Sequence, residues 1–190
     1  MKYPTPKKVT ELRNTLKKQN GVIFENALNI SNDYYRINNT AIIYKKPTPI
    51  QVVKVDYPVR SKAKIVEAYY KTPSTTDYNG IYNGKYIDYE AKETNNLSFS
   101  FKHIFTHQME HLKKVKEHGG IAFIIIYYKR ANEVFIIDID VFYKLYLENL
   151  KDGEKSIKIE KAREIGVFVP MKYTPPIDYL CAVDKLYFNE

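Results

Sequence analysis

Two linked segments decide the fold of this chain: Thr75-Thr76-Asp77-Tyr78-Asn79-Gly80 and, after a Gly-containing turn, Lys85-Tyr86-Ile87-Asp88-Tyr89-Glu90-Ala91-Lys92. In the second segment, apolar residues at 87, 89 and 91 alternate with polar residues at 86, 88, 90 and 92. This period of two predicts a β-strand with one apolar face and one polar face. Two carboxylates and an ammonium group are therefore expected on the same side of the strand.

Asp77 is expected to lie beside Glu90, because the residues between them contain Asn79-Gly80 and Asn83-Gly84, which favour a chain reversal. Carboxylate oxygens that converge in this way suit Mg²⁺, which prefers hard oxygen ligands and retains several waters. Lys92 would stabilise an attacking water or the negative charge of the transition state. The pattern indicates phosphodiester hydrolysis. The alternative is a solvated strand face, because a bare Glu-x-Lys triplet is a common pattern.

The spacing of Asp77 and Glu90-Ala91-Lys92 resembles the Asp…(Asp/Glu)-x-Lys core of the restriction-endonuclease-like nuclease superfamily. Longer matches resemble the RecU Holliday junction resolvases: Lys46-Pro47-Thr48-Pro49-Ile50-Gln51-Val52-Val53, Tyr57-Pro58-Val59-Arg60-Ser61, residues 74–80, and Tyr89-Glu90-Ala91-Lys92-Glu93-Thr94. The superfamily often has Pro before its first Asp. Thr76 stands there in this chain, and the RecU pattern also has Thr at this position. The resemblance extends from about residue 21 to near the C-terminus.

This resemblance implies an α/β fold of the restriction-endonuclease type, in which helices flank a mixed β-sheet and a basic stalk protrudes. It implies a Mg²⁺-dependent endonuclease that resolves four-way DNA junctions by paired symmetric nicks during recombination and repair. Mn²⁺ is expected to substitute for Mg²⁺. The catalytic residues would be Asp77, Glu90 and Lys92, with Lys92 stabilising the transition state. The metal-binding set would be Thr75, Asp77, Glu90 and Gln108. We expect a two-fold homodimer, since this symmetry matches that of the junction, and recombinase or branch-migration proteins as further partners.

The segment from residue 46 to residue 64 combines prolines and basic residues with apolar ones. Pro is excluded from central strands, and Lys at an edge discourages pairing with other chains, so we expect a projecting pair of extended segments. An exposed basic projection can contact phosphates, whereas the alternative is an edge hairpin without a ligand. In the resembled family this region is a stalk that enters the open centre of a four-way junction. The expected DNA contacts are Arg60, Lys54, Lys46, Lys62 and Tyr70.

Length and composition agree with one globular domain. The chain has 190 residues, 44% of them hydrophobic and 14% aromatic, which is enough for one substantial core. We expect residues 1–20 to form a flexible basic tail, and residues 21–190 to form a single nuclease domain with the stalk inserted at about 46–64. The net charge of +8 favours a polyanionic partner.

The cysteine content and the apolar segments bear on the compartment of the protein. Cys181 is the only cysteine, which excludes an internal disulfide and fits a reducing compartment. The longest apolar run, 121–128, is too short to span a bilayer, and the first residues lack the apolar core of a signal peptide, so we expect a cytoplasmic protein with no membrane partner.

Hydrophobic periodicity predicts helices behind Gly21 and over 103–118, 140–150 and 177–188, the helix at 140–150 packing through Val141, Leu145 and Tyr146. It predicts strands over 40–46, 65–71, 121–128, 133–137 and 165–170, with 40–46 and 121–128 buried on both faces.

A rival motif lies in the predicted helix 103–118. His107-Gln108-Met109-Glu110-His111 fits His-x-x-Glu-His, in which two histidines one turn apart bind Zn²⁺ and the glutamate activates water. A zinc peptidase is therefore one alternative function. A junction-binding module that does not cut DNA is another, but it would not need Asp77, Glu90 and Lys92 together.

Overall fold

A six-stranded mixed sheet forms the centre of the computed structural model, which describes residues 22–71, 75–151 and 155–188. Its strands, in spatial order, are β1 (Ile42–Lys45), β4 (Tyr78–Tyr82), β5 (Lys85–Thr94), β7 (Ile121–Tyr128), β8 (Glu133–Asp138) and β10 (Val167–Val169). Strands β5 and β7 run parallel, whereas the other neighbouring pairs are antiparallel. The predicted α/β class with a mixed sheet is confirmed. The proposed tail, residues 1–20, lies outside the described residues.

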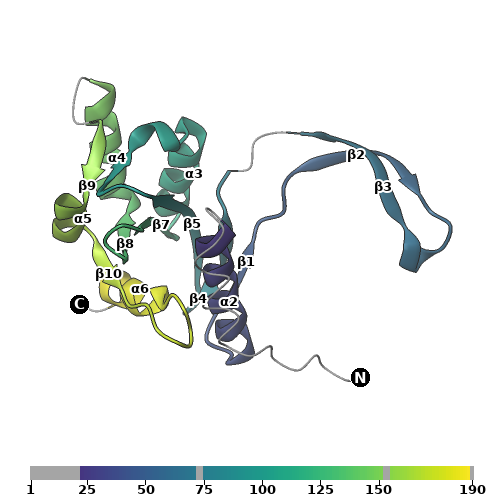
Figure 1. Ribbon diagram of the computed structural model, residues 1–190, viewed down its shortest axis with the longest axis horizontal. Coiled ribbons are helices and arrows are strands. Elements are labelled where there is room, and N and C mark those ends of the chain that lie inside the picture. Colours follow the sequence, from purple (N-terminus) through teal and green to yellow (C-terminus); the bar gives the residue numbers. More distant parts are fainter. Residues whose placement is uncertain (1–21, 72–74, 152–154, 189–190) are drawn as a thin grey trace.

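Helices cover both faces of this sheet (Figure 1). Helices α2 (Val22–Ile37) and α6 (Tyr179–Tyr187) pack on one face, and α3 (Thr106–Glu117), α4 (Ile139–Leu150) and α5 (Ile159–Ile165) pack on the other. Strand β7 contributes alternate residues to the two cores, for example Phe123 to the first and Ile124 to the second. Its central position and its burial on both faces agree with its continuous apolar sequence.

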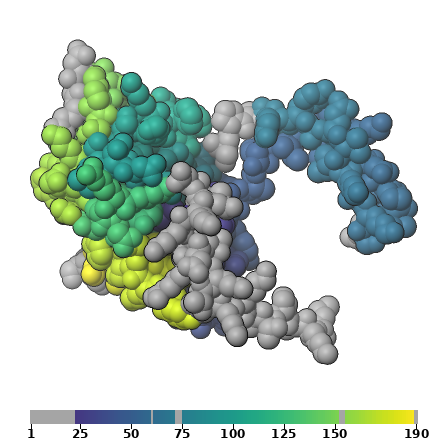
Figure 2. All heavy atoms as spheres, viewed as in Figure 1, coloured from purple at the N-terminus to yellow at the C-terminus, as the bar shows by residue number. Residues whose placement is uncertain are grey.

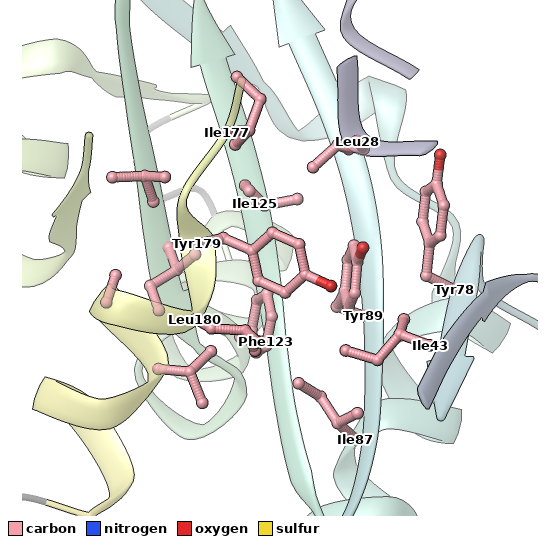
Figure 3. Packing of buried hydrophobic residues seen from close by; sticks show 14 of the residues in the cluster. Leu28, Ile43, Tyr78, Ile87, Tyr89, Phe123, Ile125, Ile177, Tyr179 and Leu180 are labelled. Atoms are coloured by element: carbon pink, nitrogen blue, oxygen red, sulfur yellow. The ribbon is translucent and has the colours of Figure 1, made fainter. Parts of the chain in front are cut away.

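The apolar face of β5 is anchored by aromatic stacking. The Tyr89 ring stacks on Tyr78 from β4 and on Phe123 from β7, with ring centroids 4.9 Å apart in both pairs (Figure 3). The β4–β5 hairpin closes through Asn83 and Gly84, both with positive φ, as an Asn-Gly turn requires. The predicted alternation is therefore present, because Ile87 and Tyr89 enter the first core while Asp88 and Glu90 point to the opposite face.

The stalk is a two-stranded antiparallel hairpin that projects away from the sheet (Figures 1 and 2). It consists of β2 (Ile50–Asp56), the short 3₁₀ helix η1 (Arg60–Lys62) and β3 (Lys64–Tyr70). Every residue of both strands is exposed. The stalk is longer than the predicted range of 46–64, because the segment expected to lead directly into the site, 65–71, forms its returning arm.

Three local expectations are only partly correct. Strand β1 buries only Ile43, because it lies at the edge of the sheet rather than inside it. A short 3₁₀ helix, η2 (Phe101–His103), precedes α3, which begins at Thr106. In α4 the expected packing of Tyr146 and Leu145 is confirmed, but Val141 is exposed, and Ile139 and Phe142 are buried instead, because the helix starts directly after its N-cap Asp138 and this sets its phase.

A second small sheet was not predicted from the sequence. It pairs β6 (Ser98–Ser100) with β9 (Ser156–Lys158), which leads directly into α5. The basic segment 155–161 therefore has a structural role, since Ile157 and Ile159 are buried in the second core. Among the described helices, none is both long and apolar enough to cross a membrane.

Candidate active site

The pairing of β4 with β5 brings Asp77 to Glu90. Tyr78 lies opposite Tyr89, so the residue before Tyr78 comes next to the residue after Tyr89 in this antiparallel pair. The Asp77 carboxylate also accepts a hydrogen bond from the backbone N–H of Ala91, at 3.0 Å. The chain reversal expected from the Asn-Gly sequences therefore places two carboxylates on one side of the sheet.

Glu90 is more deeply buried than Asp77, with 1% of its surface exposed. Its Oε1 atom forms an ion pair with Lys92 Nζ and accepts a hydrogen bond from Gln108 Nε2, both at 2.6 Å. Its Oε2 atom is buried and has no hydrogen-bond partner within the described part of the chain. Burial and the negative charge of Asp77 raise the pKa of Glu90 to about 7, against the opposing effect of Lys92 and Gln108.

Gln108 connects helix α3 to this carboxylate. Its side-chain oxygen accepts a hydrogen bond from the backbone N–H of Phe105 at 3.1 Å, and its amide nitrogen donates to Glu90. The first contact caps the N-terminus of α3, so the helix end holds the amide in place. The structure thus brings Gln108 to the predicted site, with its oxygen already used in the cap.

A second buried carboxylate, Asp88, lies two residues before Glu90 on the same face of β5 and is fully buried. Its acceptor oxygens face Lys46 Nζ at 2.7 Å, His111 Nε2 at 3.0 Å and the Tyr86 hydroxyl at 2.9 Å, and Thr76 donates to it as well. Burial raises the pKa of Asp88, but the hydrogen bonds from His111, Lys46 and Thr76 outweigh this effect and hold the pKa below its usual value.

The sequence did not reveal this second cluster. It places Asp88 and Tyr86 on the polar face of β5, but the other partners, Lys46, Thr76 and His111, lie 12 to 42 residues away, and no local pattern connects them to Asp88. Lys46 was expected on the stalk surface as a DNA contact. Instead its side chain is 14% exposed, and its ammonium group lies against Asp88 and the hydroxyls of Thr75 and Thr76. The structure therefore corrects the expected position of Lys46.

The other expected DNA contacts lie on the stalk, away from Glu90. Lys54 and Lys62 are exposed, and Tyr70 has 82% of its surface accessible. The Arg60 side chain is outside the part of the structure that is described. These residues are available to a ligand, and their contact with DNA stays a prediction.

The residues of the zinc motif are occupied in other ways. The His107 ring stacks on Phe105 with centroids 5.6 Å apart, His111 contacts Asp88, and Glu110 is exposed. Within residues 22–71, 75–151 and 155–188, no group of three or more His, Cys, Asp or Glu side chains is placed to hold a metal ion. The geometry does not favour a zinc peptidase.

The donor set at Glu90 nevertheless fits a hard divalent cation. Asp77 and Glu90 offer carboxylate oxygens, and the Glu90 Oε2 atom is buried without a partner. Two carboxylates suffice for Mg²⁺, because it keeps several waters and completes its coordination with substrate phosphates. Burial and the charge of Asp77 raise the pKa of Glu90, and a positive charge beside these groups would oppose both effects.

Known proteins resemble this chain over most of its length. The family model described as "Recombination protein U", RecU, matches residues 19–185. A protein of Geobacillus sp. (strain WCH70), named Holliday junction resolvase RecU, is 46% identical over 170 residues, which cover 89% of this chain and 85% of that protein. A protein of the same name from Staphylococcus carnosus (strain TM300) is 49% identical over 174 residues, covering 90% and 82%. Among solved structures, Archaeoglobus fulgidus Hjc, a Holliday junction resolvase, is 14% identical, with a TM-score of 0.43 over 77% of this chain and 93% of that one.

Proposed function

This chain belongs to the RecU family, and from that premise we propose that it is an endonuclease that resolves four-way DNA junctions by paired symmetric nicks during recombination and repair. The observation that carries the proposal is the convergence of Asp77, Lys92 and Gln108 on the buried carboxylate of Glu90. Lone acidic residues on a solvated strand face would not be buried and paired in this way.

Asp77 and Glu90 are proposed to hold Mg²⁺ or Mn²⁺, with Thr75 and Gln108 beside them. A cation bound there would supply Lewis-acid polarisation of the scissile phosphate and a lower pKa for a nearby water. The chain's own residues have separate tasks. Asp77 is oriented by the Ala91 N–H, Glu90 must be ionised to act as a ligand, and the Lys92 ammonium stabilises negative charge as it develops on the phosphate.

The stalk is the proposed junction-recognition element, contacting DNA phosphates through Lys54, Lys62 and Arg60, with Tyr70 at its base. Its strands bury none of their residues, so its side chains are free of the body of the protein. The net charge of +8 supports binding to a polyanion. We further propose that residues 21–190 act as one nuclease domain in a two-fold homodimer that places one site on each of two opposed strands. Cytoplasmic location and recombinase or branch-migration partners would follow from this role.

The deciding experiment compares a synthetic four-way junction with a linear duplex of the same sequence. The native protein and Asp77→Ala are incubated with each DNA in Mg²⁺, in Mn²⁺ and in EDTA. We expect paired nicks only in the junction, only with a divalent metal and only with Asp77 present. Tight junction binding without cuts in any metal would favour a binding module that does not cut DNA.

A further inference from the structure

Lys46 occupies the point where the stalk leaves the sheet. It directly follows β1 and directly precedes Pro47, after which the chain enters the stalk. Its backbone N–H donates to the carbonyl oxygen of Asp77 at 2.8 Å. The outgoing root of the stalk is therefore joined by its main chain to the residue that begins the catalytic hairpin.

The side chain of Lys46 joins three further groups. Its ammonium donates to Asp88 Oδ2 at 2.7 Å, to Thr76 Oγ1 at 2.5 Å and to Thr75 Oγ1 at 3.2 Å. An ammonium group has three N–H donors, which match these three acceptors, and His111 Nε2 lies 3.5 Å from the same nitrogen. The two threonines lie in the returning root of the stalk and Asp88 lies in β5, so one residue connects both roots of the stalk to the catalytic strand.

Burial makes these contacts hard to exchange. Asp88 is fully buried and the Lys46 side chain is 14% exposed, so water has no access to the carboxylate and little access to the lysine. Without the Lys46 ammonium, buried Asp88 would keep its contacts with Thr76, Tyr86 and His111 but lose its lysine counter-charge, which is costly for a buried pair. Lys46 is therefore poorly placed to reach a DNA phosphate and well placed to hold the segment 75–77 against β5.

We propose that Lys46 is a positioning residue that clasps both roots of the stalk to Asp88 and so sets Thr75 and Asp77 in register with Glu90. We call the contacts of Lys46 with Thr75, Thr76, Asp77 and Asp88 the root clasp. This inference rests on the proposed nuclease function and adds to it, because it assigns a lysine of the basic segment to the geometry of the cutting site rather than to DNA binding. A junction bound by the stalk would then present its scissile phosphate to Asp77 and Glu90 in a fixed position.

The test replaces Lys46 by Met, which keeps the length of the side chain and removes its charge. The matched control is Lys45→Met, since the side chain of the neighbouring Lys45 forms an exposed ion pair with Glu25 instead. Three quantities are measured: junction affinity in Ca²⁺, the single-turnover cleavage rate in Mg²⁺, and Mn²⁺ affinity from the loss of the free-ion EPR signal without DNA. For Lys46→Met we expect unchanged junction affinity, a cleavage rate lower by about 10-fold to 100-fold and weaker Mn²⁺ binding. Lys45→Met should match the native protein in all three.

A second variant separates positioning from folding. Lys46→Met with Asp88→Asn removes both charges, so the protein should regain thermal stability relative to Lys46→Met but not its cleavage rate or its Mn²⁺ affinity. Recovery of cleavage together with stability would overturn the inference, because Lys46 would then serve folding alone. Loss of junction affinity with an intact fold would also overturn it, by making Lys46 a DNA contact. If the native protein itself does not cut junctions, the proposed function fails, whereas the Mn²⁺ measurement still decides whether the root clasp shapes the site.

Discussion

Lys92 Nζ lies 2.6 Å from Glu90 Oε1, although the two residues are separated by only one position on strand β5. An extended backbone makes this possible, because alternate side chains point to the same face, whereas the same residues on a helix would diverge. The pair is shielded from water, with 1% of the Glu90 side chain and 19% of the Lys92 side chain exposed. The carboxylate that is proposed to bind metal is therefore already in contact with the ammonium that is proposed to act on the phosphate.

Replacing Lys92 by Met should lower the cleavage rate while leaving junction affinity nearly unchanged. The ammonium acts on charge that develops in the transition state, and loss of one such group typically costs about 100-fold to 1,000-fold in rate. Single-turnover cleavage and binding in Ca²⁺ separate the two effects. Lys113→Met is the control, because Lys113 forms an exposed ion pair with Asp140 instead. Equal losses of affinity and rate would show that Lys92 contributes to binding rather than to the chemical step.

Cleavage at limiting Mg²⁺ should increase with pH through about 7. Only the ionised form of Glu90 is a good metal ligand, and burial together with the charge of Asp77 raises the pKa of Glu90 to about 7. Because Lys92 lowers this pKa, the pH profile of Lys92→Met should lie at higher pH than that of the native protein. Saturating Mg²⁺ should shift the native profile to lower pH. Profiles that overlie one another at both metal concentrations would contradict the role of Glu90.

The thermal stability of the metal-free protein should depend on the ionisation of Glu90. The pKa of Glu90 in the folded protein lies above its ordinary value of 4.5, so folding favours the protonated form. The stabilisation is complete below pH 4.5 and is lost as the pH rises to about 7. Glu90→Gln cannot ionise, so its Tm relative to the native protein should increase by roughly 5 °C between pH 4.5 and pH 8. Mg²⁺ should raise the Tm of the native protein at pH 8 and leave that of Glu90→Gln unchanged.

Much of the site could be predicted because its main signals are local. Alternation in β5 places Glu90 and Lys92 on one face, and the Asn-Gly turn brings Asp77 back to them. The burial of β7 on both faces follows from its continuous apolar sequence. These features depend on residues that lie within one strand or one hairpin.

The features of the fold and the site that the sequence did not predict depend on contacts between distant segments. Asp88 faces Lys46, which directly follows β1, and His111 from α3, and no periodicity in any of these segments identifies the others as partners. The edge position of β1 likewise follows from strand order, which the apolar residues at 41–44 do not specify. The expected strand at 65–71 exists, but its pairing with β2, which makes it the returning arm of the stalk, was not predicted. Both strands are exposed and their pairing contains β-bulges, so no hydrophobic pattern in the sequence specifies the register.

Replacing Gln108 by Leu should impair both the start of helix α3 and the cutting site. The substitution removes the hydrogen bond that caps Phe105 N–H and the one that orients Glu90, which together should lower the free energy of unfolding by about 1–3 kcal/mol. The cleavage rate should decrease by about 10-fold or more, since groups that orient a metal ligand have effects of this size. Urea unfolding and single-turnover cleavage provide the two measurements. Gln108→Glu retains a capping oxygen but places a second carboxylate against Glu90, so it should keep the cap, lose stability through charge repulsion and change the metal dependence of cleavage.

The stalk should contribute binding energy through phosphates without contributing to the stability of the sheet. Lys54 and Lys62 are exposed, and β2 and β3 bury none of their residues, so replacing both lysines by Ala should change the Tm very little. Each phosphate contact releases counterions, and loss of two contacts should reduce the slope of log K against log salt concentration by about 2. The control removes the same charge from the body of the protein with Lys161→Ala and Lys172→Ala, which form ion pairs with Glu164 and Asp178. Equal changes of slope in the two double variants would mean that net charge alone accounts for junction binding, and that the stalk makes no specific phosphate contacts.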